Sequence, residues 1–401
     1  MQTSPSQGRS PGRAAVGCAT LVALAASCSV AGNLSAPEIL RELDAIVRID
    51  GSGADRTVKY AERATVSSWY ARSLLLLPLR GPLVFVFGGR SEQPLESPAA
   101  HVRELLRELP YKLGEELVLA AQASVRLGWI AELETNAQSR VVAIDGLTQL
   151  AIDLQLPLFG GDFQRFGAPA NPEQLAQARA GVNLGRPEVR TGDRWNATAL
   201  RPYGEAVTQL AAAPLDNPIA RLLLLEEVTQ LRATENEPSM QPLVDAALRA
   251  AMGHVIEGAL LRIVQGRAAE YVDLRLCAME QVRRLGGPRA VPLLLAVMVA
   301  SPVQHARGDS RYDSDPLVQL RLIHYCGQVR GEIAAAVVEL PGRKDWQVQS
   351  PLDFLATTIL NERAHYSKLR TPALVALTWS LQRPRLDPDP TWVRTWREGR
   401  P

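Results

Sequence analysis

Aromatic residues, lysine and net charge are all scarce in this sequence of 401 residues. The 46% hydrophobic, 5% aromatic and 21% charged residues make a globular composition, which excludes extended disorder and collagen-like repeats. Only 4 of the 44 basic residues are lysine, and the 42 acidic residues leave a net charge of +2. A chain this close to neutral has no positive field that would collect nucleic acid, so we expect no nucleic-acid partner.

The sequence also lacks the common signatures of catalysis and metal binding. It contains no HExxH, no GxSxG and no phosphate loop with a lysine, and its five histidines are scattered. Asp309, Asp313 and Asp315 share one loop, but without EF-hand spacing a solvated turn is the simpler interpretation. Acidic residues such as Glu226 and Glu227 fit a solvated helix face. We therefore predict no catalytic residues, no metal and no cofactor, and identify no small-molecule substrate.

The N-terminus has the pattern of an export signal. Arg9 and Arg13 precede an uncharged apolar run at residues 14–27, and Cys28 follows at once. The run is shorter than the roughly 20 residues of a transmembrane helix, so a cleaved segment is favoured over a permanent span.

The excess of arginine over lysine in the whole chain is typical of a high-GC bacterial genome.

Residues 24–28, LAASC, resemble the lipobox of bacterial lipoproteins. The resemblance implies that residues 1–27 are removed and that Cys28 is diacylated, which anchors the mature protein to a membrane of the bacterial cell envelope. Ser29 after the cysteine implies outer-membrane rather than inner-membrane retention. Two alternatives stay open: an ordinary signal peptide on a secreted protein, and a disordered leader on a cytoplasmic one.

A second apolar stretch, residues 74–87, reads LLLLPLRGPLVFVF. Pro78, Arg80, Gly81 and Pro82 interrupt it, so neither half satisfies its backbone in lipid as a spanning helix. The pattern favours two short strands or extended segments about an Arg80-Gly81 turn, or a buried connection. We predict no transmembrane span.

Apolar residues at helical spacing predict helices along most of the chain. The predicted helices are at 36–48, 56–73, 101–109, 115–131, 137–154, 199–213, 243–264, 289–300, 351–364 and 371–382, together with those described next.

An internal repeat becomes visible when helices are aligned on one arginine. The aligned residues are Arg140, Arg221, Arg275 and Arg321. In the first three helices, apolar residues follow four, seven and ten places after the arginine, which puts one stripe along one helix face. In the fourth, Tyr325 keeps the first position and Gln328 breaks the second. Each aligned helix is preceded by another apolar helix, with spacings compatible with units of about 40 to 47 residues.

The segments DNPIARLLLLEEVTQL, VDLRLCAMEQVRRLGGPRAVPLLLAVM and DPLVQLRLIHYC are similar to the second helices of HEAT-type repeats. The resemblance implies a mainly α fold, a HEAT-like α-solenoid of about four helix pairs whose stacked array exposes an extended protein-binding surface. The four arginines are then expected to be structural and to bond carbonyls or acids between repeats. An irregular all-α domain remains the alternative.

The remaining segments complete the predicted organisation. A Gly/Pro-rich insertion separates the first unit from the others, and a C-terminal helix pair covers the last repeat, with Trp392 and Trp396 either packed on it or exposed. Cys277 and Cys326 are expected to be unpaired core thiols. The predicted divisions are 1–27 leader, 28–35 tether, 36–98 N-terminal helices with a short extended segment, 99–154 first unit, 155–198 insertion, 199–342 HEAT-like repeats and 343–401 C-terminal helices and tail.

These patterns together predict a membrane-anchored envelope lipoprotein that acts as a helical-repeat scaffold, binds a protein partner and catalyses no reaction. Two other functions remain open. One is an exported enzyme with its site in the 155–198 insertion or against residues 74–98, and the other is an unanchored helical-repeat adaptor in the cytoplasm.

Overall fold

The described part of the chain is mainly helical in the computed structural model, which confirms the prediction of a mainly α fold. The described residues are 34–51, 56–61, 65–76, 83–94, 97–114, 116–156, 158–159, 201–206, 209–210, 217–236, 238, 240–266, 271–299, 315–338, 349–362, 366–383, 387 and 389–399. The predicted leader, the predicted lipidation site Cys28, Asp309, Asp313 and residues 160–198 of the insertion lie outside them.

The N-terminal region begins with one helix and continues in strands. Ser35 is the N-cap of helix α2 (Ala36–Ile46), and its backbone N–H donates to the Glu38 carboxylate at 3.0 Å. Strand β1 (Val47–Asp50) follows without a break and pairs antiparallel with β2 (Thr57–Tyr60). The helix predicted at 36–48 is therefore present and two residues shorter.

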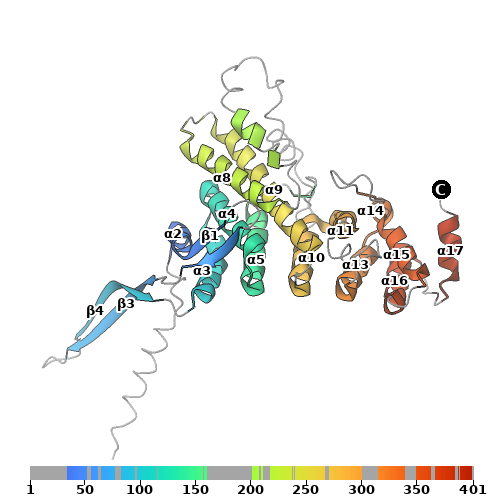
Figure 1. Cartoon of the computed structure of the whole chain (residues 1–401), viewed down its shortest axis with the longest axis horizontal. Coiled ribbons are helices and arrows are strands. Elements are labelled where there is room, and N and C mark those ends of the chain that lie inside the picture. The colour runs from blue at the N-terminus through green and yellow to red at the C-terminus, as the bar shows by residue number, and fades with distance from the viewer. Residues whose placement is uncertain are drawn as a thin grey trace, which may run out of the picture.

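The prediction of a helix at residues 56–73 is wrong. Strand β2 and the first part of β3 (Thr65–Leu76) occupy that segment, and β3 pairs antiparallel with β4 (Leu83–Pro94). The segment is rich in threonine, valine and aromatic residues, which favour extended backbone over helix. The β3–β4 hairpin projects away from the helices in Figure 1.

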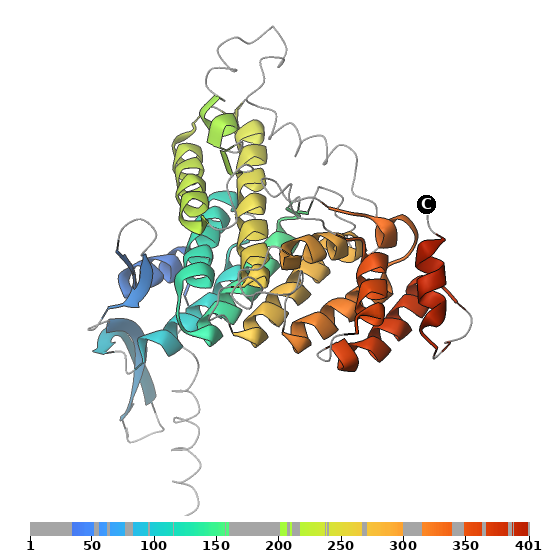
Figure 2. The ribbon, with the colours of Figure 1, turned by 45° about the vertical axis from the view of Figure 1, so that its right-hand side comes forward.

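The helices of the body lie in two rows, in which each helix packs against the next (Figures 1 and 2). The first row is α3 (Pro98–Lys112), α5 (Ala137–Asp153), α10 (Val272–Gly286), α13 (Pro316–Gln328) and α16 (Ser367–Ser380). The second row is α2, α4 (Leu117–Leu133), α9 (Gln241–Gln265), α11 (Ala290–Val299) and α15 (Pro351–Leu360). Across the rows, α2 packs on α3, α4 on α5, α9 on α10, α11 on α13 and α15 on α16.

The second predicted repeat unit does not take a place in these rows. Helix α8 (Pro218–Thr234) packs on α4 and α9 and stands beside the upper part of α9 in Figure 2. The predicted C-terminal pair continues the rows instead, as α15 and α16. The short helices are η3 (Gly287–Arg289), α14 (Gly331–Ala335) and α17 (Thr391–Glu398).

The C-terminal tail packs back on the body. Helix α17 lies against α15, with Val393 buried and Trp392 and Trp396 packed against the core. The Arg383 guanidinium lies 3.9 Å from the centre of the Trp392 ring, a cation–π geometry.

Both described cysteines are free thiols. Cys326 is buried, and burial raises the pKa of its thiol far above the ordinary value. Burial also raises the pKa of the half-buried Cys277 thiol to about 11, with the Asp145 charge adding to the effect. Neither side chain is a thiolate near neutral pH.

Two arginines of the repeat alignment cap the helix that pairs with their own. Arg140 Nε donates to the Ala131 carbonyl near the end of α4 at 2.8 Å. Arg275 Nε and Nη2 donate to the Val264 carbonyl near the end of α9 at 3.1 and 3.0 Å. The last carbonyls of a helix have no partner within it, and the negative end of its dipole favours a cation. These guanidiniums therefore join the two rows.

The same contact recurs at a residue that the alignment did not include. Arg370, the fourth residue of α16, donates to the Asn361 carbonyl just after α15 at 3.0 and 2.6 Å. In α13 the fourth residue is Gln319, which is buried, whereas Arg321 is exposed and lies 3.4 Å from Glu280 of α10. The alignment is thus two residues out of register in α13.

The capping role predicts a large stability difference between two arginines. Replacing Arg275, which is 2% exposed, by methionine leaves the Val264 carbonyl without its donors. We expect Arg275→Met to lower the free energy of unfolding by about 2–4 kcal/mol. The control Arg321→Met, at an exposed ion pair, should change it by less than about 0.5 kcal/mol. Urea denaturation measures both, and equal losses would contradict the capping role.

Candidate functional site

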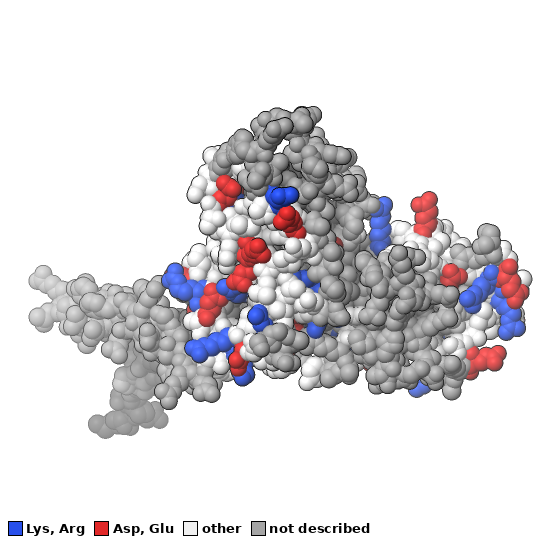
Figure 3. Space-filling model, turned by 45° about the horizontal axis from the view of Figure 1, so that its top comes forward, with Lys and Arg blue, Asp and Glu red and all other residues white. Residues whose placement is uncertain are grey.

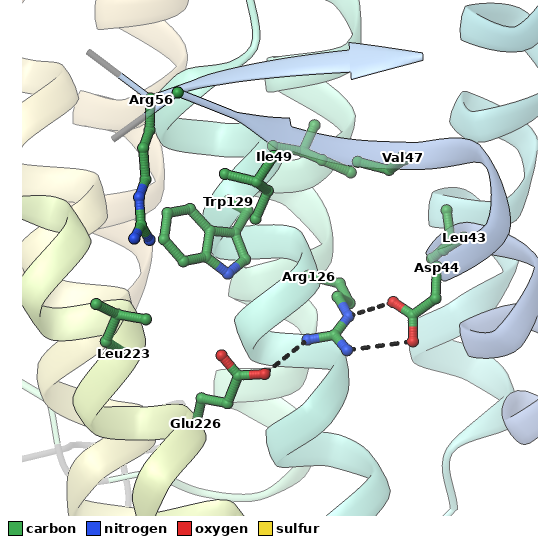
Figure 4. A pocket seen from close by; sticks show the side chains of 11 residues that line it. Leu43, Asp44, Val47, Ile49, Arg56, Arg126, Trp129, Leu223 and Glu226 are labelled. Atoms are coloured by element: carbon green, nitrogen blue, oxygen red, sulfur yellow. Dashed lines mark hydrogen bonds and ion pairs between the residues drawn. The ribbon is translucent and has the colours of Figure 1, made fainter. Parts of the chain in front are cut away.

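A pocket of about 460 Å³ opens at the N-terminal end of the two rows (Figure 4). Helices α2, α4 and α8 and strand β1 form its walls. The lining residues are Leu43, Asp44, Val47, Ile49, Gly51, Arg56, Arg126, Trp129, Ile130, Leu223 and Glu226. Most are apolar, with charged groups between them, and the volume lies in the range of ligand-binding pockets.

An ion-pair network crosses the pocket wall. Arg126 of α4 donates to both oxygens of Asp44 on α2, from Nε at 2.5 Å and from Nη2 at 3.1 Å. Its Nη1 lies 3.7 Å from the Glu226 carboxylate on α8. Burial lowers the pKa of Arg126, but hydrogen bonding and the charges of the two acids outweigh burial and raise it. The guanidinium thus joins α2, α4 and α8 across the wall.

The sequence interpretation of Glu226 as part of a solvated helix face is incomplete. Its carboxylate keeps partial exposure yet lines the pocket. Because Asp44, Arg126 and Glu226 come from separate helices, their spacing in the chain carried no signal of this network.

The apolar part of the pocket consists chiefly of an aromatic ring and two exposed aliphatic side chains. The Trp129 side chain is buried, and the Arg56 guanidinium lies 5.9 Å from its ring centre (Figure 4). Ile49 and Leu223 are 39% and 43% exposed. The described residues that line the pocket include no histidine, cysteine, serine or threonine. This lining suits the binding of an apolar group.

A buried carboxylate lies at the end of α4, the helix that also carries Arg126 and Trp129. Glu132 is 1% exposed; its Oε1 accepts from Arg221 Nη2 of α8 at 3.1 Å, and its Oε2 accepts from Arg262 Nη1 of α9. Arg221, which the alignment grouped with the repeat arginines, therefore pairs with a buried acid.

Two glycines allow the three helices to approach. A Cβ at Gly258 of α9 would lie 2.5 Å from Arg221 Nε, and one at Gly128 of α4 would lie 2.4 Å from Leu222 of α8. Both distances are shorter than a real Cβ contact, so a side chain at either position would force Leu222 or Arg221 to move.

A second titratable group lies beside the start of the predicted insertion. Glu257 of α9 accepts a hydrogen bond from the Phe159 backbone N–H. The residue as a whole is partly exposed, but burial of the carboxyl among protein atoms raises its pKa to about 8. One turn earlier, burial lowers the pKa of His254. Both groups therefore favour their neutral forms at neutral pH.

The described residues contain neither a metal-binding cluster nor a membrane-spanning helix. Within them, no three His, Cys, Asp or Glu side chains gather closely enough to hold a metal ion, and no helix is both long and apolar enough to cross a bilayer. Acidic and basic side chains intermingle on the described part of the face shown in Figure 3, so charge alone does not mark a binding surface there.

Comparison with known proteins gives no relative for the chain. It matches no protein-family model, no curated protein and no solved structure.

The raised pKa of Glu257 predicts a pH-dependent stability difference. An unfolded glutamate titrates near 4.5 and the folded one near 8, so the folded protein binds the proton more tightly. Stability therefore falls as the pH rises through this window and is constant above it. At pH 9 we expect the free energy of unfolding of Glu257→Gln to be about 1–3 kcal/mol higher than that of the wild type.

The same comparison at pH 4 should show almost no difference, because the wild-type carboxyl is then protonated in both states. Glu227→Gln, on the exposed side of α8, is the control and should match wild type at both pH values. A Glu257→Gln effect of the same size at pH 4 and pH 9 would contradict the assignment. Urea denaturation in matched buffers gives these free energies.

Proposed function

We propose that the protein is a membrane-anchored lipoprotein of the bacterial cell envelope that acts as a HEAT-like helical-repeat scaffold, binds a protein partner and catalyses no reaction. Support for the anchor comes from the basic residues, apolar run and LAASC segment of the leader. Support for the scaffold comes from the two rows of paired helices, joined by Arg140, Arg275 and Arg370.

The observation that carries the binding role is the pocket with Ile49 and Leu223 at its surface. Exposed aliphatic groups beside an apolar hollow are typical of sites that receive a side chain of a partner. Arg126, bracketed by Asp44 and Glu226, holds three of the surrounding elements in place. A rigid wall lowers the entropy lost when the partner binds.

The anchor would hold this end of the molecule close to the membrane. Cys28 precedes Ala36, the first residue of α2, by eight residues, and an extended chain spans at most about 3.6 Å per residue. Helix α2 thus begins within about 29 Å of the acylated cysteine. The pocket, whose wall includes Leu43 and Asp44 of the same helix, faces partners that lie near the same membrane.

Fatty-acid labelling in a bacterial host tests the anchor. The proposal expects label on the wild-type chain and none on Cys28→Ala, together with membrane fractionation of the wild type only. Unlabelled wild-type protein that fractionates with the cytosol would rule the anchor out.

A pair of leucine variants tests the pocket. Leu223, at the pocket, and Leu320, on α13, are 43% and 42% exposed, so neither substitution by aspartate removes a core side chain. We expect affinity purification of the lipidated protein to recover its partner with Leu320→Asp but at least about tenfold less of it with Leu223→Asp, a change of about 1.4 kcal/mol. Equal recovery with both variants would exclude the pocket as the binding site.

A further inference from the structure

The β3–β4 hairpin has no comparable packing partner among the described elements. Each strand has 12 residues, or about 40 Å at 3.4 Å per residue. Among the described elements, the two strands pack substantially on each other alone, and they project from the helical rows (Figure 1). A lone two-stranded hairpin is only marginally stable in water, so we expect a further contact to stabilise this one.

The composition of the hairpin changes along its length. The half nearest the helical body carries serines, Glu92 and Arg90, and the register pairs Ser68 with Ser91. In the half nearest the turn, Arg72 and Ser73 are followed only by apolar residues, and Leu74, Leu75 and Leu76 pair with Phe85, Val84 and Leu83. Within the described strands, no charged residue lies beyond Arg72 toward the turn.

The apolar half does not alternate with polar residues. Successive residues of a strand lie on opposite faces, so an unbroken apolar run places apolar residues on both faces. A hairpin that docks on a protein shows one apolar face and one polar face. Apolar residues on both faces instead fit a medium that surrounds the hairpin, as lipid does.

Residues of the kind found at membrane interfaces lie where the two halves meet. Trp69 pairs with Arg90, Tyr70 pairs with Gly89, and Arg72 pairs with Phe87. Tryptophan, tyrosine and basic residues concentrate at the level of the lipid headgroups. The hairpin thus has the order expected along a membrane normal: polar, interfacial and apolar.

Two features limit how deep the hairpin goes. No other described strand pairs with either edge of the hairpin, and unpaired backbone groups are not tolerated in the hydrocarbon centre. The sequence that joins the strands also contains Arg80, and an arginine at the bilayer centre costs about 2.5–3.5 kcal/mol. The insertion is therefore shallow, with the hairpin tilted into one leaflet.

We propose that the turn-proximal half of the β3–β4 hairpin inserts into the interfacial layer of a phospholipid membrane. The inference deepens the proposed function, because the hairpin would be a second contact with the membrane that carries the Cys28 anchor. One acyl anchor and one inserted hairpin together orient the protein, as a single flexible tether does not.

Vesicle flotation of unlipidated protein separates the hairpin from the lipid anchor. The sample is the mature chain, residues 28–401 with Cys28→Ala, mixed with vesicles of phosphatidylethanolamine and phosphatidylglycerol. We expect this protein to float with the vesicles. The double variant Leu75→Asp/Phe85→Asp, which places one charge on each strand and each face of the apolar half, should reduce the floating fraction at least about tenfold.

The matched control is Ser67→Asp/Ser91→Asp, which adds the same two charges, again one on each strand and each face, to the polar half. It should float like the parent. Circular dichroism should show the same helical signal and thermal midpoint for all three proteins, because the hairpin does not build the helical rows.

Three results would overturn the inference. They are no flotation of the unlipidated parent, equal flotation of both double variants, and a dimer in light scattering that Leu75→Asp/Phe85→Asp abolishes while no protein floats. The last would mean that a second copy covers the hairpin. Flotation without fatty-acid labelling at Cys28 would refute the lipoprotein anchor and leave the hairpin inference standing, and labelling without flotation would do the reverse.

Discussion

The Glu132 carboxylate faces two guanidiniums in a place that water hardly reaches. It lies at the end of α4 and accepts from Arg221 of α8 and Arg262 of α9. Removing a carboxylate from water costs several kcal/mol, which hydrogen-bonded cations offset only in a well-fixed geometry. The three helices are therefore held in one arrangement, and Gly128 and Gly258 leave the space it requires. The pocket depends on this contact, because α8 supplies Leu223 and Glu226 to its wall.

The helical rows rely on a different use of arginine. Arg140, Arg275 and Arg370 each occupy the fourth position of a first-row helix and donate to a carbonyl at the end of the paired helix. Gly266, with φ of 78° at the end of α9, leaves room for Arg275, since a Cβ there would lie 2.7 Å from its Nε. The same side chain thus closes a helix end and fixes the distance between the rows.

Much of this architecture could be predicted from the sequence, because the apolar stripe and the arginine are local features. The register in α13 could not, because Arg321 resembles the other arginines more than Gln319 does. When the alignment uses Gln319, the residues four, seven and ten places later are Ile323, Cys326 and Val329, and all three are buried. Arg370 fits the first two positions of that pattern, with Leu374 and Leu377 buried, and a longer alignment would have found it.

Strand β2, the first part of β3 and the pocket were missed by the same reasoning, for different reasons. Residues 56–73 have apolar positions compatible with helical spacing, but the threonines, Val58, Trp69 and Tyr70 favour strands. The pocket depends on contacts between segments far apart in the chain, from Asp44 to Glu226. No short motif records such contacts, so Glu226 resembled any other glutamate on a helix.

Hydrogen exchange of the Glu132→Gln protein tests the central claim, that one buried carboxylate fixes α8 against α4 and α9. The account predicts that the backbone amides of α8 lose protection by at least about 100-fold, since breaking a buried ion pair costs several kcal/mol. The amides of α13 and α16, at the other end of the rows, should keep their wild-type protection. Unchanged protection of α8, or an equal loss in all three helices, would contradict it.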